Sequence, residues 1–255
     1  MREADYPILE FDPEREAMIE PSQVQPPVDV PEHCLVCFFH EVVGMLTEHH
    51  PSRVAHVIHS EMGEHPVYEL DWHGRRLALA HPGIGGPLAG ATLEELIAMG
   101  CRKFIACGGA GALRPELVVG HVVVPTSAVR DEGTSYHYLP PGEPATVTPG
   151  ALEAIEQVLG EEDVPYVTGP TWTTDAIYRE TPSRVARRRE QGCLTVEMEA
   201  AAFFAVARFR GVAMGQLLYA ADDLSGEQWD HRDWQRQRDV RERVAELAAE
   251  ACLRL

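Results

Sequence analysis

The stretch Lys103-Phe-Ile-Ala-Cys-Gly-Gly-Ala-Gly-Ala-Leu113 carries the pattern that decides the fold class. Its first five residues form a short apolar run, which is typical of a buried strand, and a cluster of glycines follows directly. A predicted helix at 91–99 precedes it and is closed by Gly100, a residue type that commonly ends helices. A second apolar run at 121–125 follows it. This alternation indicates helices that connect the strands of one sheet.

The same alternation extends toward both ends of the chain. Further strands are predicted at 34–39 and 212–219, with a hairpin formed by 66–70 and 76–80 around His73-Gly74. Further helices are predicted at 41–50, 149–160, 197–210 and 234–255. Residues 1–33 contain six prolines and few periodic apolar positions, so we expect an extended N-terminal arm. The rest, 34–255, is predicted to be a single three-layer αβα domain with a mixed central sheet.

Composition excludes several classes of function. The chain has 255 residues, 22 basic against 40 acidic side chains, a net charge of −18 and 45% apolar residues. That apolar fraction excludes wholesale disorder. The acidity argues against nucleic-acid binding and against docking on an anionic membrane, because both rely on clustered Lys and Arg.

Other features of the sequence predict a cytoplasmic protein without a metal or cofactor. The acidic N-terminus does not resemble a signal peptide, and no apolar run reaches the roughly 18 residues of a membrane span. Six cysteines lie mostly in apolar runs, as expected of reduced, buried thiols. Two metal-like spacings, Cys34-x-x-Cys37 and His56-x-x-His59, lack further ligands nearby, so no metal site is predicted.

Two glycine-rich junctions follow predicted strands, where open α/β sheets place their ligand sites. The first, 81–87, contains Gly83 and Gly85 and leads into a helix, whose N-terminus favours an anion or a polar oxygen. The second contains Gly109 and Ala110, and the backbone N–H groups of a turn there could hold an anion. Each pattern also fits a tight turn with no ligand.

Two further junctions carry carboxylates. In the stretch 195–200, Glu197 and Glu199 are two residues apart and cannot both point the same way, so one is expected to face a cleft and the other to have a structural role. Asp222 and Asp223 end the last apolar run, and an acid at a strand end is well placed as a general acid or base.

The order of these junctions resembles the nucleoside phosphorylase and nucleosidase superfamily, which includes uridine phosphorylase, hexameric-type purine nucleoside phosphorylase and methylthioadenosine nucleosidase. The resemblance covers 34–225, and Val196-Glu-Met-Glu-Ala200 is its most specific piece. The stretches 128–137 and 173–176 also fall where that family has its corresponding segments.

The resemblance implies cleavage of an N-glycosidic bond through a transition state in which the ribose gains positive charge. It assigns the ribose hydroxyls to Glu199, with Met198 packed against the sugar. It assigns protonation of the departing base to Asp222, with Asp223 left as the alternative, and this acid favours a purine base. The substrate-binding residues expected beside them are Met198, Glu197, Gly83, Gly85, Gly109, Ala110, Ile177, Tyr178, Arg179 and His137.

The sequence departs from the family at the phosphate site. Phosphorolytic relatives carry an arginine after the first strand, where this chain has Phe-Phe-His-Glu-Val at 38–42, and another where it has Ala106. Arg53 or Arg75, lent by a neighbouring subunit of a homo-oligomer, remain candidates. Glu41 lies close to the glutamate that activates water in hydrolytic members, and it is our third catalytic candidate.

Three functions therefore stay open. The leading one is a phosphorylase that releases the base and ribose 1-phosphate, with inorganic phosphate as co-substrate. The second is a hydrolytic nucleosidase, and the third is a catalytically silent nucleoside-binding protein.

Overall fold

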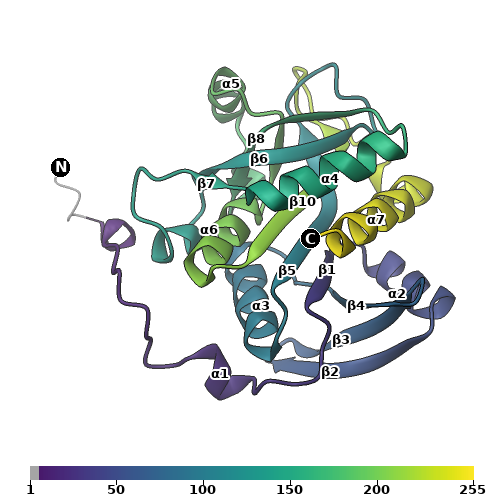
Figure 1. Cartoon of the computed structure of the whole chain (residues 1–255). Coiled ribbons are helices and arrows are strands. Elements are labelled where there is room, and N and C mark those ends of the chain that lie inside the picture. Colours follow the sequence, from purple (N-terminus) through teal and green to yellow (C-terminus); the bar gives the residue numbers. More distant parts are fainter. Residues whose placement is uncertain (1–5) are drawn as a thin grey trace.

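The computed structural model describes residues 6–255 and contains one mixed sheet with helices on both faces, as predicted (Figure 1). The strands are β1 (His33–Cys37), β2 (Ser52–Ser60), β3 (Gly63–Trp72), β4 (Arg75–Ala80), β5 (Lys103–Ala112), β6 (Val122–Asp131), β7 (Ala145–Thr146), β8 (Tyr166–Thr174), β9 (Thr195–Glu197) and β10 (Ala213–Asp223). Their order is β10-β6-β8-β9-β5-β1-β4-β3-β2, with β7 attached to β6.

The sheet also closes on itself, because β10 pairs with β5 as well as with β6. The strands β5, β10, β6, β8 and β9 form a ring, and β1, β4, β3 and β2 extend from β5 as an open wing. Strands β4, β1, β5 and β10 run parallel to their neighbours in this series, so their carboxyl ends meet at one edge. Parallel sheets place ligand sites at such an edge.

Helices cover the two faces of the sheet. The α-helices are α1 (Pro21–Val24), α2 (His40–His49), α3 (Gly86–Met99), α4 (Pro149–Glu161), α5 (Pro182–Glu190), α6 (Ala200–Arg210) and α7 (Arg238–Leu253). The short 3-10 helices are η2 (Pro7–Leu9), η3 (Thr134–His137), η4 (Ile177–Arg179) and η5 (Trp234–Arg236). Helices α3 and α6 pack together on one face, and α4 and α7 pack together on the other (Figure 1).

Helix α6 is apolar on all sides because it is enclosed. Its first eight residues, from Ala200 to Ala207, are all buried, and five of the eight are alanines. A helix without a polar face is stable only inside a core. The small side chains let α3, β10 and β6 pack closely against α6. This packing holds the end of β9, which leads into α6, close to the start of α3.

The glycine cluster after 107 was predicted to be a turn, and this is wrong. Strand β5 continues through it to Ala112, since β10 pairs with it along its length and β9 pairs with Gly111 and Ala112. Glycine has a low strand propensity, so only the neighbouring strands keep this segment extended.

Other boundaries also differ from the prediction. Helix α3 starts at Gly86, well before position 91, and α6 starts at Ala200, which leaves Glu197 as the last residue of β9. The strand β2 was not predicted. It contains His56 and His59, whose odd spacing in a strand points them to opposite faces, unlike the helical spacing considered above.

Residues 6–32 contain only η2 and α1, and they run along the outside of the molecule (Figure 1). Helix α1 packs on α3, and Val28 donates a backbone hydrogen bond to Met99 at the end of α3. Residues 1–5 of the predicted arm lie outside the described residues.

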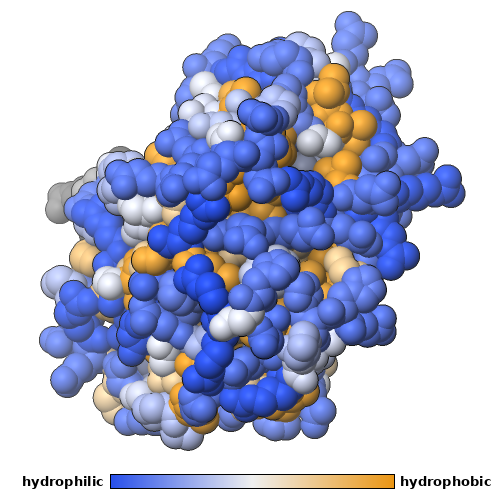
Figure 2. Space-filling model, turned by 45° about the vertical axis from the view of Figure 1, so that its right-hand side comes forward, coloured by the Kyte–Doolittle hydropathy of each residue, from blue (hydrophilic) through white to orange (hydrophobic). Residues whose placement is uncertain are grey.

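The surface is largely polar. The face in Figure 2 is mostly hydrophilic with separate apolar patches, consistent with a mean hydropathy of −0.19. All six cysteines are buried and free of disulfides, as the sequence predicted. Within the described residues, none of the helices has the length and apolar character needed to cross a bilayer.

Candidate active site

The centre of the site is a contact between the loop after β4 and the start of α6. The backbone N–H of Gly85 donates a hydrogen bond of 2.6 Å to Oε1 of Glu199. Gly83 and Gly85 both have positive φ angles, 77° and 86°, so this loop adopts a conformation that favours glycine. A Cβ on Gly83 would lie 2.2 Å from Leu88, so the loop also has no room for a side chain there. The fold thus brings Gly83 and Gly85, in the loop after β4, together with Glu199 at the start of α6.

Glu197 has the structural role that the two-residue spacing allowed. Its Oε2 accepts hydrogen bonds from the backbone N–H groups of Glu199 (2.7 Å) and Ala200 (2.6 Å), so it caps the N-terminus of α6. Thr173 on β8 donates to the other oxygen at 2.6 Å. Both carboxylate oxygens of Glu197 therefore accept hydrogen bonds from the protein, whereas Glu199 accepts from the backbone N–H of Gly85 and also interacts with that of Met198.

Burial changes the protonation of both carboxyls. Glu199 is only 6% exposed, and burial together with the neighbouring charge of Glu197 raises its pKa to about 8. Burial raises the pKa of Glu197 to about 7, although its hydrogen bonds from Thr173 and the backbone oppose the rise. Near neutral pH the free protein therefore holds Glu199 mainly as the neutral acid.

A third buried carboxyl, Glu132, was missed by the sequence analysis. Its Oε2 lies 3.2 Å from where a Cβ on Gly86 would be, and it accepts a hydrogen bond of 3.0 Å from the backbone of Ser135. Burial raises the pKa of Glu132, and its charge contributes to the raised pKa of Glu197. Glu132 lies in a polar, proline-bearing stretch without periodicity, which offered no signal that one acid there is buried.

Asp222 and Asp223 have different surroundings at the end of β10. Asp223 is ion-paired with Arg232 and accepts the backbone N–H of Ser225 at 2.7 Å, so it is committed to the loop that follows. Asp222 accepts one hydrogen bond, from the indole Nε1 of Trp229 at 2.6 Å. Its other oxygen lies 3.5 Å from where a Cβ on Gly111 would be, so Asp222 rests over the end of β5.

The glycine-rich end of β5 contributes an open backbone surface. Gly109 is exposed, whereas Ala110 beside it is buried. A Cβ on Gly109 would lie 3.1 Å from the ring of Tyr219. Glycine at 109 therefore lets the Tyr219 ring pack against the backbone while leaving that backbone exposed. Ala110 instead points into the core.

The place where phosphorolytic relatives carry arginines is lined by aromatic rings. Phe38 lies against Gly108, and its ring centroid is 6.3 Å from that of His81. His40 is also 6.3 Å from His81. Burial lowers the pKa of His81, which favours its neutral imidazole.

Glu41 is engaged by an arginine from the C-terminal helix. Its Oε1 is 2.7 Å from the guanidinium of Arg241, which also lies over the ring of Phe39 at 4.7 Å from the centroid. The carboxylate is 39% exposed. No local pattern in the sequence indicates this pair, which joins α2 to α7.

The residues expected to contact the base lie mainly on the surface. Ile177 is 52% exposed and Tyr178 is 95% exposed, and Arg179 follows them on the same exposed 3-10 turn. The next residue, Glu180, turns inward and lines a cavity of about 170 Å³ beside Trp229. Met198 is half-buried next to Glu199, and His137 is exposed at the end of η3.

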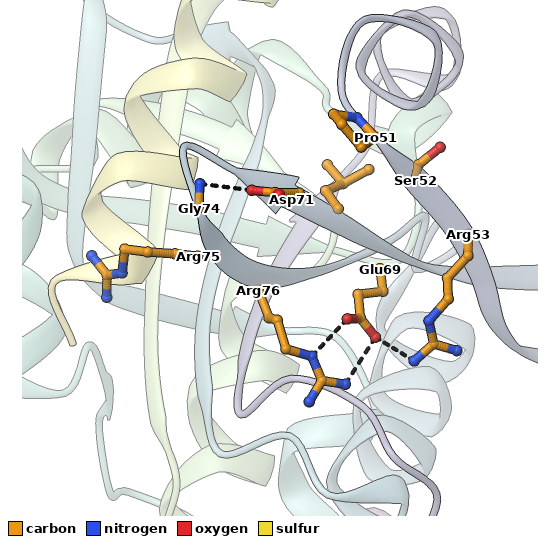
Figure 3. A pocket seen from close by; sticks show the side chains of 9 residues that line it. Pro51, Ser52, Arg53, Glu69, Asp71, Gly74, Arg75 and Arg76 are labelled. Atoms are coloured by element: carbon orange, nitrogen blue, oxygen red, sulfur yellow. Dashed lines mark hydrogen bonds and ion pairs between the residues drawn. The ribbon is translucent and has the colours of Figure 1, made fainter.

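A cavity on the outer wing holds the two arginines considered for phosphate (Figure 3). It has a volume of about 310 Å³ and shares no lining residue with the Glu199 site. Arg53 points to Glu69, which it contacts at 2.5 Å, and Arg75 donates to the backbone of Leu253. Both side chains are occupied by the protein's own acceptors. Among the described residues, no group of three or more His, Cys, Asp and Glu side chains is arranged to hold a metal ion.

The chain belongs to the phosphorylase superfamily, whose family model matches residues 32–255. It is 34% identical over 154 residues to the guanosine phosphorylase of Halorubrum lacusprofundi, covering 60% of this chain and 64% of that protein. It is 29% identical over 159 residues to the uridine phosphorylase of Haemophilus influenzae, covering 57% of this chain and 63% of that protein. The matched segments thus span less than two thirds of the length of either relative.

Solved structures show the same fold. The uridine phosphorylase of Vibrio fischeri superposes with a TM-score of 0.76 at 24% identity and covers 94% of this chain and 100% of its own. The AMP nucleosidase of Bacteroides thetaiotaomicron superposes with a TM-score of 0.72 at 23% identity, covering 88% and 87%. The nucleoside phosphorylase-like fold that the motifs implied is thereby confirmed.

Proposed function

We propose that this protein cleaves the N-glycosidic bond of a purine nucleoside with inorganic phosphate, giving the free base and ribose 1-phosphate. The observation that carries the proposal is the buried Glu199 carboxyl, held by the Gly85 N–H at the sheet edge to which β10 brings Asp222. The guanosine and uridine phosphorylases named above support the reaction, and Asp222 supports a purine base.

Glu199 has the properties needed to bind the ribose. The Gly85 N–H engages Oε1 of Glu199, and a carboxylate has further acceptor capacity, so ribose hydroxyls can also donate to this group. Such hydrogen bonds favour the ionised carboxyl. An ionised Glu199 then stabilises the positive charge that develops on the ribose as the glycosidic bond breaks, more strongly in the transition state than in the ground state.

Asp222 is the group proposed to protonate the departing base. The hydrogen bond from Trp229 fixes one of its oxygens and leaves the other directed toward the end of β5. As the bond between C1′ and the base nitrogen breaks, Asp222 delivers a proton to the base and a phosphate oxygen forms the new bond to C1′. Asp223 is less suitable because Arg232 and Ser225 already occupy its carboxylate.

Water is the second candidate acceptor, and a specific observation favours it. The sequence has no arginine at 38–42 or at 106, the positions from which phosphorolytic relatives bind phosphate with charge-assisted hydrogen bonds. Against water, the glutamate expected to activate it, Glu41, is paired with Arg241. We therefore keep phosphate as the first proposal, with the exposed backbone at Gly109 as part of its site.

An assay of a nucleoside panel with and without phosphate tests this proposal. Guanosine, inosine, adenosine and uridine are incubated with the enzyme, and products are identified by mass spectrometry. Ribose 1-phosphate formed only with phosphate supports phosphorolysis. Free ribose in both conditions would establish hydrolysis, and intact nucleosides would favour the silent binding protein.

A further inference from the structure

A cavity beside Asp222 has no role in the chemistry described so far. It has a volume of about 170 Å³ and lies between the start of α5 and the loop after β10. Its walls include the apolar side chains of Val185 and Leu224 and the ring of Trp229. An aromatic ring and aliphatic walls around a few polar groups suit a planar heterocycle.

The cavity adjoins the general acid through two contacts. Trp229, which lines it, donates its indole N–H to Asp222. The second contact is made at Gly111. A Cβ on this glycine would be 2.5 Å from Leu224, which also lines the cavity, and 3.5 Å from Asp222. A base held in the cavity would therefore lie next to the carboxyl proposed to protonate it.

Two glutamates line this cavity, and Glu180 is the partly buried one, whereas Glu227 is exposed. Among the described residues, the Glu180 carboxyl forms neither a hydrogen bond nor an ion pair, although Arg189 lines the same cavity. Arg189 instead donates to the backbone oxygen of Ser225. Burial, and then the charge of Asp222, raise the pKa of Glu180 to about 7. The geometric link between the two carboxyls is Trp229, which lines the cavity with Glu180 and donates to Asp222.

An unpaired carboxyl in a half-closed apolar cavity costs free energy in the free protein. That cost is relieved when a ligand supplies N–H donors. A carboxylate accepts two parallel N–H groups especially well. Guanine presents two adjacent donors, its ring N–H and its amino group, whereas adenine presents a ring acceptor at the matching position.

We propose that Glu180 selects the base, accepting hydrogen bonds from the adjacent ring and amino N–H groups of guanine within this cavity. The inference rests on the proposed function, because it assumes that Asp222 serves the reaction at the cavity's edge. Glu180 directly follows Ile177–Arg179, the exposed turn whose residues the sequence predicts to bind substrate.

The test compares kcat/KM for guanosine, inosine and adenosine in the wild type, Glu180→Gln and Glu180→Ala. We expect both variants to lose about 10- to 100-fold with guanosine, since hydrogen bonds to a charged group disappear. Inosine, with one donor, should lose less, and adenosine should not lose activity. Glu190→Gln, an exposed glutamate at the end of α5, is the matched control and should behave as the wild type. An unchanged guanosine-to-adenosine ratio in both variants would overturn the proposal, and thermal unfolding of each variant checks that it is folded.

Binding of free bases keeps the inference testable if no nucleoside is cleaved. Guanine and adenine are titrated separately, and quenching of tryptophan fluorescence reports occupancy near Trp229. Tighter binding of guanine than of adenine, reduced at least 10-fold in Glu180→Gln, would support the role of Glu180 even if the proposed reaction fails. Equal binding of both bases by the wild type, or binding that Glu180→Gln does not weaken, would refute it.

Discussion

The substitution Glu199→Gln is expected to stabilise the free protein at alkaline pH while removing its activity. Glu199 is 6% exposed and its pKa is raised from 4.5 to about 8, first by burial and then by the charge of Glu197. Between these two values the native state keeps a proton that the unfolded chain has lost. The free energy of unfolding therefore falls as pH rises from about 4.5 to about 8 and stays low above that.

The size of the effect follows from the same numbers. At about 1.4 kcal/mol per pH unit, the interval from 4.5 to about 8 corresponds to roughly 5 kcal/mol lost by the wild type. Glutamine does not ionise, but its buried amide has a desolvation cost of its own. We therefore expect the variant to exceed the wild type by about 2–4 kcal/mol at pH 9 and to be about 1–2 kcal/mol less stable than the wild type at pH 5, where only the amide cost remains.

Urea unfolding at pH 5, 7 and 9 measures this difference, with Glu190→Gln as a control at an exposed glutamate. At the same time, kcat for nucleoside cleavage should fall at least about 100-fold, because the stabilising charge is gone. A variant that is no more stable than the wild type at pH 9 would refute the reasoning. It would mean that the native carboxyl is already ionised without cost at neutral pH.

Four further substitutions separate catalytic from structural roles. Asp222→Asn should lower kcat by about 10²- to 10⁴-fold with little change in stability, whereas Asp223→Asn should mainly lower the melting temperature; kcat values that fall in the reverse order would assign the acid to Asp223. Glu41→Gln should retain nucleoside cleavage, since its carboxylate is already paired with an arginine, and complete loss of activity would point to water activation. Thr173→Val should destabilise the protein by about 1–3 kcal/mol in urea, because Glu197 loses a buried donor, and an unchanged midpoint would contradict that role.

The alternation of elements was predictable because apolar periodicity is a local property. Short apolar runs separated by helical segments already required a layered sheet, and the carboxyl ends of its parallel strands had to meet at one edge. That reasoning accounts for the loop after β4 and for the end of β10, whereas β9, which precedes Glu199, runs antiparallel to β5.

The remainder depends on contacts between distant segments. The backbone at Gly109 is extended because β10 pairs with it. Glycine has a low strand propensity, so the local sequence does not predict this conformation. The burial of Glu132 follows from the packing of η3 on α3 and α6. Glu180 lines the cavity although Arg179 before it is exposed, and this depends on the backbone conformation of the single 3-10 turn η4.

The most direct test of the account is the fate of guanosine with the wild-type protein, in phosphate and in a phosphate-free buffer. We predict guanine and ribose 1-phosphate in phosphate, and intact guanosine without it. Free ribose in both buffers would contradict phosphorolysis. Intact guanosine in both would contradict the assignment of Glu199 and Asp222 to the cleavage of this nucleoside.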